Sequence, residues 1–80
     1  MASPMLVTSV ESTTLTTIAY DIADQRLWLE FQSRAVYCYF GVPVAVHQAL
    51  LMAASKGAYF NRYIRPRFPY QKDSKLPQQP

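Results

Sequence analysis

The chain contains one cysteine and one histidine, Cys38 and His47, the side chains best suited to nucleophilic and acid–base chemistry. A catalytic thiolate requires a partly exposed, electropositive setting and a histidine within hydrogen-bond reach. Cys38 instead lies in an apolar stretch, with Val36 and Phe40 on its own side, which favours a buried and inert thiol. His47 is expected at the surface or boundary of a helix. We therefore predict that the protein is not an enzyme.

One histidine and one cysteine are too few for a metal site, which needs several clustered His, Cys, Asp or Glu ligands. Asp21 and Asp24 by themselves are more typical of a solvated turn. The chain has only two glycines, so it lacks a glycine-rich loop that could hold a phosphate group. The sequence predicts no catalytic residue, no metal, no cofactor and no small-molecule substrate.

Positive charge gathers towards the end of the sequence. Residues 56–80 carry six Lys or Arg residues and one Asp, whereas residues 1–55 are slightly acidic. Cations and rings alternate in this basic segment, whose cations are Arg62, Arg65, Arg67 and Lys72. Arginine pairs with phosphate and stacks on bases, so the pattern predicts nucleic-acid binding, with RNA as the partner. The alternative is an edge segment whose rings dock on the core while its arginines are solvated.

Tyr37 and Tyr39 alternate along one predicted strand, and Trp28 is expected beside them on the neighbouring strand. Exposed rings on a small sheet are a common platform for single-stranded bases. The alternative is that this face packs beneath the helix, because so small a core needs its large side chains. The sequence leaves both interpretations open.

The length of 80 residues and the mass of 9.1 kDa allow one small domain with a single core. Half of the residues are hydrophobic and 16% are charged, which is too apolar for a disordered chain. The longest apolar run, residues 49–54, is far too short to span a membrane. With one cysteine and no secretory signal pattern, the expected location is the cytoplasm, with no membrane partner.

Alternation of apolar and polar residues predicts strands over residues 5–10, 15–21, 26–32 and 35–40. A turn is expected at 21–25, and the two-residue link at 33–34 would join strands 26–32 and 35–40 into an antiparallel hairpin. Residues 43–56 predict one main helix, which Gly57 would end as a left-handed cap. The domain is expected to cover residues 1–70, and residues 71–80 are expected to be a disordered polar tail rich in proline.

The predicted helix has more apolar surface than one sheet face requires. Val46 and Leu50 lie on the side expected to face the sheet. Val44, Leu51 and Met52 lie on the other side, which predicts a contact with a partner protein or with a second copy of the chain. The residues expected to form the core are Leu27, Leu29, Phe31, Val36, Cys38, Phe40, Val46, Leu50 and Ala53.

A set of short motifs follows a fixed order along the chain: residues 19–21, 27–31, 36–40, 42–43, 54–57 and 59–61, together with Ile64. This ordered set resembles the KTSC domain family, a module found at the C-terminus of some lysyl-tRNA synthetases and as stand-alone bacterial proteins. The resemblance implies an α+β fold: a small, strongly bent antiparallel sheet of four or five strands, similar to Sm-like or SH3-like barrels, with one main helix. It also implies RNA binding without catalysis. The alternative function is a protein-interaction or self-assembly module that uses Val44, Leu51 and Met52.

Overall fold

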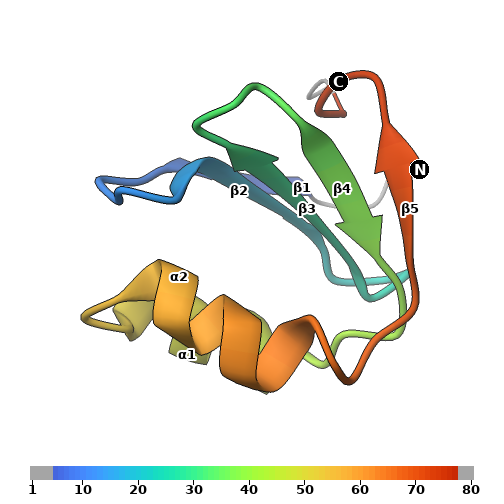
Figure 1. Ribbon diagram of the computed structural model, residues 1–80. Helices are drawn as coiled ribbons and strands as arrows, with labels where there is room; N and C mark the ends of the chain where they lie inside the picture. Colours follow the sequence, from blue (N-terminus) through green and yellow to red (C-terminus); the bar gives the residue numbers. More distant parts are fainter. Residues whose placement is uncertain (1–4, 78–80) are drawn as a thin grey trace.

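The computed structural model describes residues 5–77 and consists of a sheet with a helical layer against one of its faces (Figure 1). Five antiparallel strands pair in the order β1-β2-β3-β4-β5. Their bounds are β1 Met5–Ser9, β2 Leu15–Asp21, β3 Arg26–Phe31, β4 Val36–Tyr39 and β5 Tyr70–Asp73. The helical layer consists of α1 Val44–Met52, α2 Lys56–Tyr59 and the π-helix η1 Phe60–Ile64. The α+β class is confirmed, but the sheet is open rather than closed into a barrel, because β1 and β5 lie at opposite edges.

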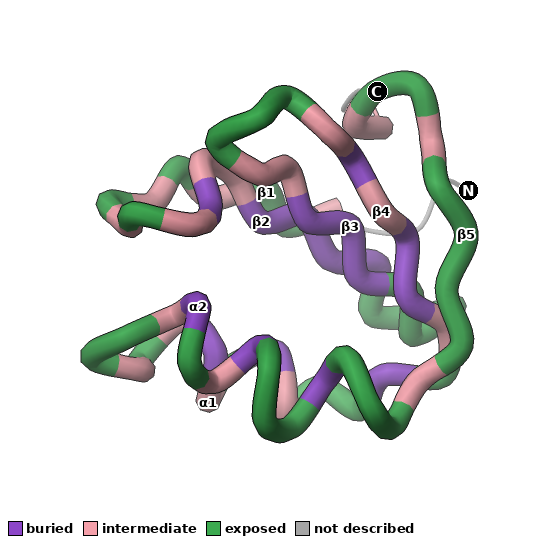
Figure 2. The backbone as a smooth tube through the Cα atoms, viewed as in Figure 1, coloured by how far each residue is buried: buried purple, intermediate pink, exposed green. Residues whose placement is uncertain are grey.

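The core lies between the sheet and the helical layer, where Figure 2 shows buried backbone on both layers. Alternate residues of β2 and β3 face this core, as the period-2 pattern predicts. The buried members of this core cluster are Leu15, Ile18, Tyr20, Leu27, Leu29, Tyr39, Val42, Leu50, Phe60 and Ile64. Of the predicted core residues, Leu27, Leu29, Val36, Cys38 and Leu50 are buried, and Phe31, Phe40, Val46 and Ala53 are half-buried.

The hairpin between β3 and β4 differs from the predicted one by one residue of register. Arg34 adopts a left-handed backbone with φ 75°. The Phe31 N–H donates to the Ala35 carbonyl at 2.9 Å, so the connection is longer than two residues. Leu29 therefore pairs with Tyr37, whereas a two-residue link would oppose Leu29 to Cys38.

This register decides which side chains share a face. Leu27 lies opposite Tyr39, so the two strand tyrosines face the helical layer with the leucines. Trp28 lies opposite Cys38 on the outer face. The expectation that Trp28 lies beside the tyrosines is therefore wrong, because a shift of one residue moves a side chain to the other face.

The helical layer is broken where the sequence predicts one continuous helix. α1 ends at Met52, and Ala53 is extended. A new turn begins at Ser55, whose hydroxyl accepts a hydrogen bond from the Ala58 N–H at 3.2 Å. The prediction that Gly57 ends a helix is wrong. Gly57 lies buried inside α2, where an added Cβ would overlap the Thr14 side chain. Gly57 therefore serves close packing between α2 and the β1–β2 loop.

The prediction that the chain is disordered from Gln71 onwards is wrong for the first residues of this segment. Residues 70–73 form β5 and pair with β4. The Trp28 indole N–H donates to an Asp73 carboxylate oxygen at 2.9 Å. Leu76 packs on a second apolar cluster, on the outer face, formed by Ala19, Trp28, Val36 and Cys38. These contacts hold in place a polar segment whose residue types do not by themselves favour a strand. The last three residues of the predicted tail, 78–80, lie outside the described residues, as do residues 1–4.

Candidate functional site

Cys38 and His47 do not form a catalytic pair, because they lie on opposite faces of the sheet. Cys38 belongs to the outer apolar cluster, and burial raises the pKa of its thiol to about 11, with a smaller contribution from the Asp73 carboxylate. The thiol is therefore protonated and a poor nucleophile at neutral pH. Among residues 5–77, no cluster of three or more His, Cys, Asp or Glu side chains could hold a metal ion.

His47 is buried rather than at the surface, with only 2% of its area exposed. Its ring stacks on Tyr20 with centroids 4.5 Å apart, and neither ring nitrogen has a hydrogen-bond partner among residues 5–77. The Tyr20 hydroxyl donates to the Val42 carbonyl at 2.6 Å, which holds the stacked pair beneath the sheet. His47 therefore acts as a packing residue of the core.

We expect the burial of His47 to make stability depend on pH. Burial lowers the pKa of this imidazole, so below about pH 6.5 the unfolded chain binds a proton that the folded chain does not. The free energy of unfolding should therefore fall as pH drops from 7.5 to 5. His47→Phe keeps a stacked ring and should remove this dependence, as measured by urea denaturation at several pH values. Equal pH dependence in parent and variant would contradict the expectation.

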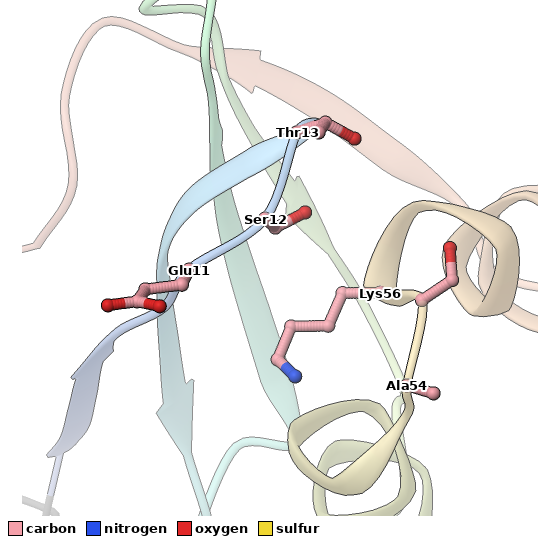
Figure 3. Close-up of a pocket in the computed structure, with 6 residues that line it drawn as sticks. Glu11, Ser12, Thr13, Ala54 and Lys56 are labelled. Atoms are coloured by element: carbon pink, nitrogen blue, oxygen red, sulfur yellow. The ribbon is translucent and has the colours of Figure 1, made fainter.

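A polar pocket of about 370 Å³ lies between the β1–β2 loop and the link from α1 to α2 (Figure 3). The Lys56 ammonium donates to the Ala53 carbonyl at 3.1 Å, and the Glu11 carboxylate points away from it. The Ser12 hydroxyl accepts from the N–H groups of Thr14 and Leu15 at 3.0 and 3.2 Å. These polar groups serve the local turns, so the pocket has a structural rather than a chemical role.

A second pocket, of about 310 Å³, is lined by residues of the β3–β4 hairpin, of the helical layer and of β5. Five rings line this aromatic pocket: Phe31, Tyr37, Tyr39, Phe60 and Tyr70. Its other lining residues are Ser33, Ala35 and Arg65. The rings pack mainly edge to face, with centroids 5.3 to 5.8 Å apart, an arrangement that fixes their orientations.

The surroundings of the aromatic pocket are positive. Arg65, which directly follows η1, lines the pocket. Burial raises the pKa of Tyr39 to about 12, and the positive charge of Arg65 acts in the opposite direction. Lys72 lies opposite Tyr37 in the β4–β5 pair, so its side chain leaves the sheet on the same face. Asp73 is on the other face, where it binds Trp28. Among the eight lining residues, all of them in the described part of the chain, none is acidic.

The structure brings together part of the predicted site. Arg62, Arg65, Arg67 and Lys72 are all exposed along the path from η1 to β5. Tyr39 is only 3% exposed and Tyr37 is half-buried, so they form pocket walls rather than an open platform. Phe31 and Phe60 were missed as site residues, because their place beside Tyr39 depends on the hairpin register and on the π-helix.

The predicted partner interface on α1 is only partly exposed. Val44 is 42% exposed and Met52 is 86% exposed. Leu51 is half-buried and packs against the main core cluster. Any apolar contact surface on this helix would therefore rest on Val44 and Met52.

Fold and site together define a small two-layer α+β domain with a basic-rimmed aromatic pocket at one end. A family model described as "KTSC domain" matches residues 11–68, and the chain belongs to this family. The crystal structure of a KTSC domain protein from Yersinia pestis superimposes with a TM-score of 0.83 at 33% identity, covering 88% of this chain and 99% of that one. The solved relative has the same fold.

The same domain occurs both inside large proteins and as short ones. The lysine–tRNA ligase of Trichormus variabilis is 43% identical over 53 residues, which are 66% of this chain but only 9% of the ligase. A protein of Tsukamurella paurometabola is 42% identical over 59 residues, which are 74% of this chain and 88% of the relative. This chain therefore corresponds to only a small part of each ligase, and the ligase activity is a property of those longer proteins. No helix within residues 5–77 is long and apolar enough to cross a membrane.

Proposed function

We propose that the protein is a non-catalytic module that binds single-stranded RNA through the basic segment between η1 and β5. The observation that carries the proposal is a run of four exposed cations, Arg62, Arg65, Arg67 and Lys72, of which Arg65 lines the aromatic pocket. Within residues 5–77, the one side-chain hydrogen bond of these cations joins Arg65 to the neutral Asn61 amide, at 3.5 Å, and the Arg62 guanidinium lies 5.4 Å from the centroid of the Tyr63 ring. Their charges are thus available for phosphate groups.

The relatives support this proposal. The ligases that contain the domain are named for tRNA, so this module accompanies an activity directed at RNA in those proteins. Binding to phosphates does not depend on sequence, so we expect weak affinity, in the micromolar range, with little preference among bases.

We expect the affinity for RNA to fall steeply with salt. Each phosphate contacted on a single strand contributes about −0.7 to the log–log slope of affinity against salt. Replacing Arg62, Arg65 and Arg67 together by alanine should flatten that slope by about two units and weaken all sequences alike. Fluorescence anisotropy with labelled hexanucleotides at several salt concentrations measures both quantities.

The control variant removes Arg26 and Lys75, which are exposed cations outside the segment from Arg62 to Lys72. It should keep most of the parent's slope. A parent that shows no binding at low salt, or an equal loss per cation removed in both variants, would remove the proposal.

The second candidate function is self-association through α1, favoured by the exposure of Val44 and Met52. Met52→Glu places a charge on this surface without touching the core, so it should shift a dimer to monomer with unchanged thermal stability. Sedimentation velocity at high micromolar concentration measures the mass. A parent that is already monomeric there contradicts self-association through α1.

A further inference from the structure

The aromatic pocket has room for one flat ring system. Its volume of about 310 Å³ is at the small end of the range for ligand pockets, roughly 300–1,000 Å³. The walls come from the β3–β4 hairpin, from the end of the helical layer and from β5, segments held together by the sheet and by the core. A single base fits within such a volume.

One ring of the pocket is free to stack. Tyr70 is 58% exposed and contacts Tyr37 and Tyr39 at centroid distances of 5.7 and 5.5 Å. Those two rings are themselves held by Phe31 and Phe60. The position of Tyr70 is therefore fixed on one side while its other side remains accessible to a ligand, so stacking does not require the core to rearrange.

The charges at the pocket select an anionic ligand. Arg65 lines the pocket from η1, and Lys72 projects from β5 on the same face as Tyr37. A planar aromatic group attached to a phosphate matches both features, because the rings accept the base while the cations pair with the phosphate. The Ser33 and tyrosine hydroxyl groups are further hydrogen-bonding groups in the lining.

We propose that the aromatic pocket takes a single unstacked nucleobase, with its adjoining phosphate held between Arg65 and Lys72. The inference rests on the RNA binding proposed above and names the part of the strand that this pocket recognises. The same chemistry would fit a free nucleoside monophosphate, so the experiment includes both ligands.

The test uses hexauridylate with one 2-aminopurine, whose fluorescence is quenched when the base stacks. Binding of the parent protein should quench it. Tyr70→Ser should abolish the quenching and weaken binding about 5- to 100-fold without changing the salt slope, because stacking involves no counterion. The matched control is Tyr63→Ser, which removes an exposed ring of η1 that lies tilted against Tyr59 outside the pocket. This variant keeps the charge of Arg62, which lies over the Tyr63 ring, and should leave the quenching and the salt slope unchanged.

The phosphate contact is tested separately. Arg65→Gln should reduce the salt slope by about 0.7 and should also reduce the quenching, because Arg65 holds the phosphate next to the stacked base. Arg67→Gln should reduce the salt slope but leave the quenching unchanged. Free uridine 5′-monophosphate is titrated against the bound hexanucleotide. If the monophosphate displaces the hexanucleotide only weakly, the ligand of the pocket is a base within a strand. If the monophosphate displaces it at concentrations similar to that of the hexanucleotide, the ligand of the same pocket is a free nucleotide.

The outcomes separate this inference from the proposed function. Salt-dependent binding with no quenching, and with equal affinity for the parent and Tyr70→Ser, overturns the base pocket and leaves RNA binding standing. Absence of any binding at low salt overturns both. Circular dichroism and thermal melting of each variant confirm that the exposed substitutions leave the fold intact.

Discussion

Leu29→Ala should lower the free energy of unfolding by about 2–5 kcal/mol, the range for truncating a buried leucine. Leu29 is fully buried in the main core cluster, and its strand pairs with both β2 and β4. Domains of this size have total stabilities of about 5–15 kcal/mol, so the loss would unfold a large share of the molecules at mild denaturant concentrations. Urea denaturation followed by circular dichroism measures the change.

Two comparisons make the Leu29 result specific. Phe31→Ala should cost less than its size implies, because Phe31 is half-buried and faces the aromatic pocket. Leu6→Ala, at an exposed position of β1, should change stability by no more than about 0.5 kcal/mol. If Leu29→Ala proves as mild as Leu6→Ala, the core is not where the sheet and helical layer place it.

Gly57→Ala should destabilise the protein by about 1–3 kcal/mol, the cost of forcing extra volume into a packed contact. Helix propensity alone predicts the opposite sign, since alanine is favoured over glycine within a helix by about 1 kcal/mol. The added Cβ would overlap the Thr14 hydroxyl and press on the Thr14 Cβ, so α2 and the β1–β2 loop would have to separate. The sign of the change therefore tests the structure directly.

Thr14→Ala provides the matching rescue, since it removes the nearest of the atoms that the new methyl group would meet. The double variant Gly57→Ala, Thr14→Ala should recover part of the stability lost by Gly57→Ala. Thermal melts of the four proteins in the cycle give the coupling energy. A stabilising Gly57→Ala, or a coupling of zero, would show that the two residues are not in contact.

Much of the architecture follows from the sequence pattern. The alternation in residues 26–31 and 36–39 predicts strands with opposite faces, and the turn after Asp21 forms where polar residues interrupt it. In that turn the Asp21 carboxylate accepts hydrogen bonds from the N–H groups of Ala23 and Asp24 at 3.0 and 3.2 Å. Local chemistry of this kind is visible in sequence, because it involves residues close together along the chain.

The exposed cations are also visible in the sequence, since their positions after residue 55 set the charge asymmetry without reference to the fold. The aromatic pocket that Arg65 lines is not visible in the sequence. The aromatic pocket joins the end of β3 to η1 and β5, and residues 31 and 60 meet only because the chain folds back on itself. No periodicity along the chain encodes such a contact.

The sequence by itself determined the α+β class, the first four strands followed by a helix, and the basic end of the chain. Tertiary structure alone decided the hairpin register, the burial of His47 and the β5 pairing of a polar segment. The left-handed backbone of Arg34 sets the register, and a shift of one residue exchanges the two faces of a strand. Such outcomes depend on which partners a side chain meets across the core, and contacts between distant residues outweigh the weak preferences of each segment.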